Sequence, residues 1–442
     1  MTDAPMPPGR MGVPLVGETL AITRNIFGFL EERHRRYGPV FKSGVFGRKV
    51  VFLSGLEGAE AFYHPDHITR ADAHPFPLVD MFGGINMEMY DGPRHFALKS
   101  IALTAFDPTT LAGYLPDLER LIEATLARLE TARDFSAIVE LRRLAIEAIC
   151  RNVMGLDPGP DTAVMTADYG AVLTGILSVP VPVPGTPYAR ARRARDRLLA
   201  RIHDVIRQRR ATPGADGLSR ILTARAADGR VYTDAEAALE VHHMVIAGYI
   251  VYALMAEGMR HLALQPGLRA RCLAEVDAHA AGSPVTTATL GRLALVTTVI
   301  LEAKRWTPLV PLAFGRALKT FTCAGCKIPA GWTVYLALSL NNKDSAIYAD
   351  PERFDPDRFG AGRAEHRKHP MAFIPQGAEP PAGHRCLGLD YSTMLGTLFL
   401  TLLLRGYDWE IPPQDLAWNW TSVPPVPRDG LRMRLSPRIP GG

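Results

Sequence analysis

The sequence lacks several features that would place it in a specialised class of protein. Its 5 cysteines are an odd number and form no disulfide framework, which favours a reducing compartment. The longest apolar run, residues 244–256, is shorter than the roughly 20 residues that a membrane-spanning helix needs. The N-terminus has no apolar core of the length found in signal peptides. We therefore expect a cytoplasmic protein without a membrane anchor.

Strong charge and obvious linkers are also missing. The 50 Lys and Arg residues nearly balance the 45 Asp and Glu residues, which leaves a formal charge of +5. This excess is too small and too dispersed to predict nucleic-acid binding. The sequence has no Ser/Gly-rich linker, charge block or internal repeat, and 47% of its residues are hydrophobic. We predict one domain with a large core, spanning residues 1–442.

Helical patterns dominate what is present. Four long segments combine apolar spacing with good helix formers: 111–129, 135–154, 188–210 and 234–264. Residues 50–54 and 333–338 are predicted as short strands, and the alternating prolines of 178–187 predict a loop. The expected fold class is mainly α, with a small β lobe near the N-terminus.

A lone cysteine, Cys386, lies at the end of a Gly/Pro-rich segment, 373–388, just before an apolar helix. Glycines let the backbone approach a flat ligand and let its N–H groups point at the sulfur. Together with His384 and Arg385, these groups would lower the pKa of the thiol and hold a thiolate. A thiolate is the axial ligand that favours O–O cleavage at haem iron. The alternative is a buried free cysteine at a helix N-terminus.

Two distant motifs complete a set. Glu302 and Arg305 are three residues apart within a predicted helix, so they lie on one face and can pair. Arg358, in a Pro-rich segment without a helical pattern, can join them. We predict a buried network of these three charges behind the cysteine segment, where removing one partner would leave an unpaired buried charge.

In this order and spacing, the three motifs resemble the cytochrome P450 family. The resemblance extends over nearly the whole chain, from the proline-rich segment 7–18 to residues 407–410. It implies the P450 fold, a helical triangular prism, with haem b (iron protoporphyrin IX) ligated by Cys386. The cysteine segment is similar to that of bacterial fatty-acid peroxygenases. The overall pattern is similar to bacterial relatives of the retinoic-acid hydroxylases.

The same resemblance implies which residues surround the haem. The expected contacts of the propionates are His95, Lys99, Arg316 and His384. Lys99 and His384 stand where the family usually has arginine, so the charge of His384 depends on pH. Phe373 and Gly388, at the two ends of the cysteine segment, are also expected at the cofactor.

The predicted distal helix departs from the family pattern. In place of an acid and an alcohol it has Ile250 and Val251, which carry no exchangeable proton. Gly248 still allows the helix to open over the iron. Tyr249 either donates a hydrogen bond there or packs in the core. The uniformly apolar helix predicts an apolar small-molecule substrate.

The reaction type therefore stays open at this point. Hydrogen peroxide brings its own protons, and the enlarged cysteine segment favours it, although the Arg-Pro clamp of the peroxygenases is missing and His242 or His243 would have to replace it. Dioxygen would need protons from substrate hydroxyls or water, and electrons from a ferredoxin or reductase. A non-oxidative isomerase or dehydratase of pre-oxygenated substrates, and a haem-binding sensor without turnover, are further alternatives.

Overall fold

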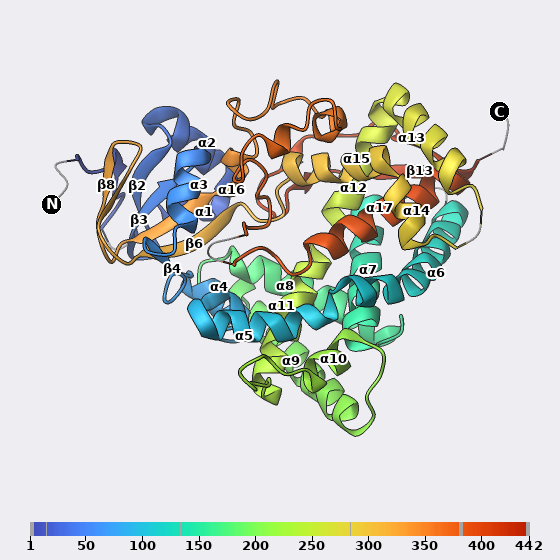
Figure 1. The fold of residues 1–442 in the computed structure, drawn as a ribbon, viewed down its shortest axis with the longest axis horizontal. Coiled ribbons are helices and arrows are strands. Elements are labelled where there is room, and N and C mark those ends of the chain that lie inside the picture. The colour runs from blue at the N-terminus through green and yellow to red at the C-terminus, as the bar shows by residue number, and fades with distance from the viewer. Residues whose placement is uncertain (1–3, 15, 133, 283, 380–382, 439–442) are drawn as a thin grey trace.

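The computed structural model describes residues 4–14, 16–132, 134–282, 284–379 and 383–438. A lobe containing the main sheet lies at one end of the long axis, and helices fill the rest of the molecule (Figure 1). The outline narrows from a broad upper edge towards α9 (Pro187–Ala211) and α10 (Gly217–Thr223). This arrangement confirms the predicted mainly helical fold with a small β lobe.

The main sheet has six strands in the order β1-β2-β3-β9-β6-β4. Their bounds are Gly9–Arg10, Val40–Val45, Arg48–Leu53, Thr333–Ala337, Leu312–Ala317 and Ile68–Thr69, in that spatial order. Strand β3 pairs in parallel with β9, with Val50 opposite Thr333. Parallel pairing needs a long crossover, which here includes most of the helical part of the chain. The lobe therefore combines N-terminal strands with strands from much later in the sequence.

The predicted long helices are present, with two corrections. Helices α6 (Pro108–Ala132) and α9 cover their predicted segments. The helix predicted over 135–154 begins later, because Phe135 belongs to strand β5 (Asp134–Ser136) and α7 (Ala137–Ile149) starts only after it. Ser136 accepts a hydrogen bond from Val139 N–H and caps this helix, so the chain changes from strand to helix at that residue.

The predicted helix over 234–264 is interrupted. Helix α11 (Asp234–Tyr249) and helix α12 (Tyr252–Leu264) meet at Ile250 and Val251, where the Val251 N–H donates to Gly248 O at 3.3 Å. Within the described residues, Asp234–Leu264 is also the one stretch long and apolar enough to cross a membrane, but 83% of its 18-residue apolar window is buried inside the fold. It is thus a core helix.

The remaining elements surround this central helix. The other helices are α1 (Thr19–Arg24), α2 (Ile26–Tyr37), α3 (Gly55–Tyr63), α4 (Phe76–Met81), α5 (Gly92–Ala102), α8 (Pro160–Ile176), α13 (Pro266–His279), α14 (Thr287–Arg292), α15 (Ala294–Trp306), α16 (Leu338–Asn341) and α17 (Leu389–Gly406). The other strands are β7 (Phe321–Cys323), β8 (Cys326–Ile328), β10 (Tyr407–Glu410), β11 (Trp418–Asn419), β12 (Val426–Pro427) and β13 (Arg432–Pro437).

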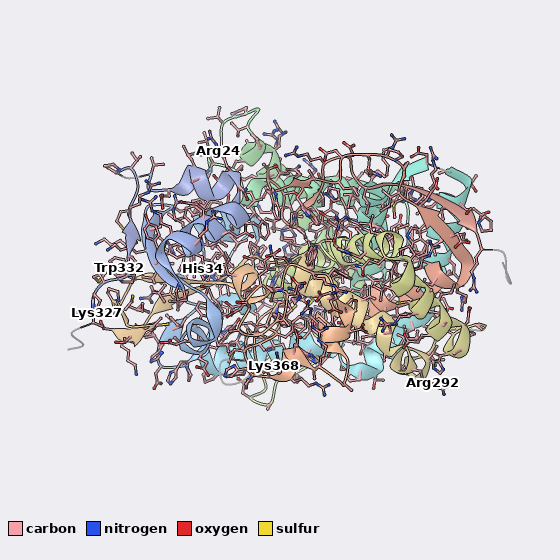
Figure 2. All side chains as sticks on the ribbon, turned by 90° about the horizontal axis from the view of Figure 1, so that it is seen from above. Arg24, His34, Arg292, Lys327, Trp332 and Lys368 are labelled. Atoms are coloured by element: carbon pink, nitrogen blue, oxygen red, sulfur yellow. The ribbon has the colours of Figure 1, made fainter. Side chains whose placement is uncertain are left out.

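The labelled basic residues Lys327, Lys368 and Arg292 lie at separate places around the outline, in line with the dispersed charge (Figure 2).

Candidate functional site

A cavity of about 180 Å³ lies where α11, α5 and the segment before α17 meet, and Cys386 lines it. Gly377 and Gly388, from the two sides of the cysteine segment, line it as well. The backbone at Gly377 has a positive φ of 87°, and a Cβ there would lie 2.2 Å from His384 O. Only glycine fits this close approach, which folds the segment back on itself behind the sulfur.

The sulfur of Cys386 receives hydrogen bonds from two sides. The Gly388 N–H points at it, and Gln376 Nε2 lies 3.8 Å from Sγ. Burial nevertheless raises the pKa of the Cys386 thiol and outweighs the backbone hydrogen bond and the nearby positive charges. The sequence predicted that N–H groups, His384 and Arg385 would lower this pKa; the Gly388 N–H does lower it, and the nearby charges that do so belong to His243 and Lys304. A metal ion bound by the sulfur would remove the proton outright.

Basic side chains line the same cavity. His95 hydrogen-bonds to Met87 O and Gly383 O, each at 3.0 Å, and Lys99 Nζ lies 2.9 Å from Glu379 Oε1. His384 Nε2 is 3.3 Å from Asp91 Oδ1, while burial lowers the pKa of His384 to about 4. His95, Lys99 and His384 are thus brought together as the sequence predicted, with His384 neutral at pH 7.

Sequence reasoning missed Arg70, which also lines the cavity. It follows strand β4, whose Thr69 pairs with the predicted Arg316. The side chain of Arg316 is absent from the cavity lining and donates to Ala71 O at 3.3 Å. In the sequence, Arg70 is only an arginine that follows Thr69. The strand pairing that places its side chain at the cavity is not visible in the sequence.

Phe373 lies outside the cavity lining as well. Its ring packs on Phe359 with centroids 5.0 Å apart, behind the cysteine segment. This contact ties the cysteine segment to the 3₁₀ turn Pro356–Phe359 that carries Arg358, a segment in which the sequence showed no helical pattern. The Phe373 ring therefore supports the cysteine segment from behind and does not contact the cavity.

On the opposite wall, Gly248, Ile250 and Val251 line the cavity where α11 ends. A Cβ on Gly248 would lie 2.4 Å from Ile149 Cγ1 of α7, so this glycine is required for close packing of the two helices. Tyr249 faces away from the cavity, with its ring 5.8 Å from that of Tyr252. Burial raises the pKa of Tyr249 to about 12, which fits a packed core tyrosine.

The two histidines before this break differ in their surroundings. His242 is fully buried and is hydrogen-bonded to Met81 O at 3.0 Å and to the Tyr169 hydroxyl at 3.3 Å. His243 instead lines the cavity, with Nε2 3.2 Å from Glu88 Oε2 and Nδ1 3.7 Å from Glu240 Oε1. The sequence showed the pair of histidines but not the two carboxylates.

His243 and its two carboxylate neighbours form a group that we call the distal cluster: Glu88, Glu240 and His243. Burial alone would lower the pKa of His243, but its contacts with Glu240 and Glu88 raise it to about 10. Burial would likewise raise the pKa of Glu88, whereas the hydrogen bond from His243 holds it well below its usual range. The imidazole is therefore protonated at neutral pH, at both ring nitrogens.

A second chamber of about 210 Å³ adjoins the first and shares His243, Ala247 and Ile250 with it. Its walls come from the N-terminal helices, α4, α8, α11 and the segment around 310. Glu88 and His243 are the acidic and basic side chains of its lining, Tyr335 and Thr23 add hydroxyl groups, and the other lining residues are apolar. Such a chamber is suited to an apolar molecule with one polar end.

The predicted network behind the cysteine segment is confirmed. Glu302 accepts hydrogen bonds from Arg305 at 2.7 and 2.8 Å and from Arg358 at 3.1 Å, and all three side chains are fully buried. Glu365, 2.8 Å from Arg358, is a fourth member that the sequence did not indicate.

These residues fit a haem. A half-buried cysteine lines the cavity, cations suited to carboxylates line the same cavity, and an apolar helix forms the opposite wall. The model of the family described as cytochrome P450 matches residues 7–419. The chain belongs to the cytochrome P450 family. The predicted membership is thereby confirmed.

Similar proteins cover the chain from end to end. Putative cytochrome P450 120 of Synechocystis sp. is 27% identical over 440 residues, covering 98% of both chains. Abscisic acid 8'-hydroxylase 3 of Oryza sativa subsp. japonica is 28% identical over 442 residues, covering 97% of this P450 and 86% of the relative. Similarity to both is therefore global.

Solved structures agree in fold. Cyanobacterial CYP120A1 with bound retinoic acid superposes with a TM-score of 0.90 at 27% identity, covering 99% of this chain and 100% of that chain. CYP152N1 with myristic acid gives a TM-score of 0.81 at 22% identity, covering 99% and 100%. The latter likeness is one of fold alone.

Proposed function

We propose that this P450 is a monooxygenase that oxidises an apolar small molecule with dioxygen. The observation that carries the proposal is the distal cluster, which places a protonated histidine in the wall shared by the cysteine cavity and the apolar chamber. Relatives named as hydroxylases match over nearly the full chain, which is in line with the same type of reaction.

In this proposal Cys386 ligates the iron, and Arg70, His95 and Lys99 bind the propionates. When bound, the haem would supply the redox chemistry at its iron. The protein orients the substrate: the apolar chamber holds its hydrocarbon body, and Ile250 shapes the wall that it shares with the cysteine cavity. Because the chamber walls are mostly apolar, they also exclude water from the reacting carbon.

The distal helix lacks the acid and alcohol that would supply protons, so another group of this chain must supply them. Ile250 and Val251 hold no exchangeable proton, whereas His243 carries protons on both nitrogens and can release one from Nε2 towards Glu88. His243, Ala247 and Ile250 lie at i, i+4 and i+7, on one face of α11. A donor two turns before the helix break can therefore serve the same wall of the cavity through ordered water or a substrate hydroxyl.

Dioxygen chemistry also requires electrons from outside the chain. We propose a ferredoxin or a reductase as the electron donor and the cytoplasm as the location. The cysteines of the described chain are all free, which suits a reducing compartment.

The ligand assignment is tested with Cys386→Ser and the matched control Cys326→Ser, which changes a cysteine of the hairpin formed by β7 and β8. We expect Cys386→Ser to lose the absorption band of the reduced carbon monoxide complex that marks thiolate ligation, and Cys326→Ser to keep it. An unchanged band in Cys386→Ser would contradict the assignment.

The proton source is tested by measuring product formed per dioxygen consumed. We expect His243→Gln to lower this ratio by about tenfold or more, because general acids typically contribute at least that much. His279→Gln, on the exposed end of α13, should leave the ratio unchanged. An unchanged ratio in His243→Gln would contradict the relay. Turnover with peroxide alone, and none with dioxygen and a reductase, would contradict the choice of oxidant while leaving Cys386 as ligand.

A further inference from the structure

The distal cluster contains more negative than positive charge. One imidazole faces two carboxylates, so protonated His243 neutralises only one of them. Glu240 is 1% exposed, and its Oε1 has no hydrogen-bond partner among the described residues. Its Oε2 accepts from Met87 N–H at 3.3 Å. A buried carboxylate oxygen without a donor is costly, and its residue lines the cavity.

Other charged groups near the cluster do not remove this excess. The positive charge of Arg70 also acts on Glu88 and lowers its pKa, but Arg70 donates to Phe314 O and is assigned to a haem propionate in the proposed function. His74 is buried, and burial lowers its pKa to about 4, so it is neutral at pH 7. Lys99 pairs with Glu379. A ligand that reaches the cluster therefore meets hydrogen-bond acceptors and a net negative charge.

The accessible part of the cluster is Glu88. Its side chain keeps 47% of its surface exposed, compared with 20% for His243 and 1% for Glu240. Glu88 lines both the cysteine cavity and the apolar chamber, so this surface borders the space between them. A molecule whose apolar body fills the chamber would place its polar end against the Glu88 carboxylate.

From this geometry we propose that the distal cluster binds a hydroxyl group of the substrate and discriminates against a carboxylate. The hydroxyl donates to a carboxylate oxygen of Glu88 or Glu240, whereas an ionised acid would place a third negative charge beside the two glutamates. A site that hydrogen-bonds a hydroxyl can strongly reject an analogue without that donor, because the acceptors of the site then stay unpaired. This inference rests on the proposed function and names its substrate class: apolar alcohols.

The proposal also supplies the missing connection for protons. A hydroxyl bound at Glu88 lies next to the proton on His243 Nε2 and can pass a proton towards the cysteine cavity. The same contact would orient the substrate, because its donor end is fixed at one wall while its body remains in the apolar chamber.

The test is isothermal titration calorimetry of the haem-loaded protein at neutral pH with retinol and retinoic acid, and with dodecanol and dodecanoic acid. Each pair shares one hydrocarbon body and differs at its polar end. We expect each alcohol to bind at least about tenfold more tightly than its acid, a difference of about 1.4 kcal/mol in binding free energy. Equal affinity, tighter binding of the acids, or no binding of either alcohol would overturn the proposal.

Variants locate the selectivity. Glu88→Gln and Glu240→Gln keep the shape of the side chain while removing one negative charge, and each should reduce the preference for alcohol to about threefold or less. Glu410→Gln, an exposed residue of β10, should keep the full preference. If both cluster variants keep it too, the cluster is not the binding site. The carbon monoxide band, measured on the same samples, reports separately whether the haem-thiolate assignment holds.

Discussion

Two groups of charged side chains lie in different parts of this P450 and differ in how they are buried and paired. The network behind the cysteine segment joins Glu302, Arg305 and Arg358 with all three side chains fully buried. Both oxygens of Glu302 accept hydrogen bonds, and the two guanidinium groups also donate to backbone carbonyls. In the distal cluster, Glu240 Oε1 has no hydrogen-bond partner among the described residues, and Glu88 faces the cavity.

The difference separates a supporting role from a binding role. A fully paired charge network gains nothing from a ligand, and it fixes the segments that it joins. An incompletely paired cluster gains a hydrogen bond when a ligand with a donor binds. The unpaired acceptor destabilises the free protein, and a ligand that pairs it therefore binds more tightly than one that does not. Buried charge alone therefore does not identify a functional site; incomplete pairing beside a cavity does.

The largest effect should come from breaking the paired network. Glu302→Ala leaves two buried arginines without their carboxylate, which costs roughly 3–5 kcal/mol of folding free energy. We expect aggregated or haem-free protein, measured by soluble yield and haem content. Glu31→Ala, which removes only a surface partner of Lys343, should change stability by less than about 1 kcal/mol. A soluble, haem-loaded Glu302→Ala would show that the network is dispensable.

The close packing of α11 against α7, beside the cysteine cavity, is tested by Gly248→Ala. The new Cβ would lie 2.4 Å from Ile149, so we expect the variant to lose about 1–3 kcal/mol of stability in denaturant unfolding. Gly267→Ala, on α13 with open space around it, should instead stabilise by about 0.5–1 kcal/mol. In an Ile149→Ala background, which lacks Cγ1 and Cδ1, Gly248→Ala should cost less stability than it does in the wild type. An equal cost in both backgrounds would mean that the glycine acts through the backbone of the helix break.

The distal cluster should make stability depend on pH. The folded pKa of His243 is raised from 6.5 to about 10, so its contribution is complete below about pH 6.5 and is lost as pH rises through about 10. Glu88 has a lowered folded pKa, so its contribution is present above about pH 4.5 and is lost as pH falls. We expect wild type to exceed His243→Gln by about 1–3 kcal/mol at neutral pH, and by less near pH 10. A difference independent of pH would contradict the charged pair.

The smallest effect is expected at Tyr249. Because its ring packs against Tyr252 and not in the cavity, Tyr249→Phe should change stability by less than about 0.5 kcal/mol and leave substrate affinity unchanged. Tyr252→Phe should cost more, since the Tyr252 hydroxyl accepts a hydrogen bond from Arg142 at 3.0 Å. A loss of affinity in Tyr249→Phe would restore Tyr249 to the site.

Local sequence patterns were enough to predict much of the secondary structure. Apolar spacing located α6 and α9, because a helix face repeats along the chain whatever surrounds it. The segment 178–187 was predicted as a loop from its prolines alone, and it connects α8 to α9. The interruption at Ile250 was not predictable from spacing, because its neighbours on both sides have the same helical pattern.

For the candidate site, the sequence by itself indicated the cysteine that we propose as the ligand and the buried charges behind it. Cys386, Glu302, Arg305 and Arg358 were identified because they occur in motifs whose order and residue types are specific. Tertiary structure decided which distant side chains meet. It brought Arg70 to the cavity through the pairing of β4 with β6, and it placed Glu88 against His243, residues 155 positions apart by their numbers in the chain. Such contacts depend on packing between segments far apart in sequence, and a single sequence holds no local signal for them.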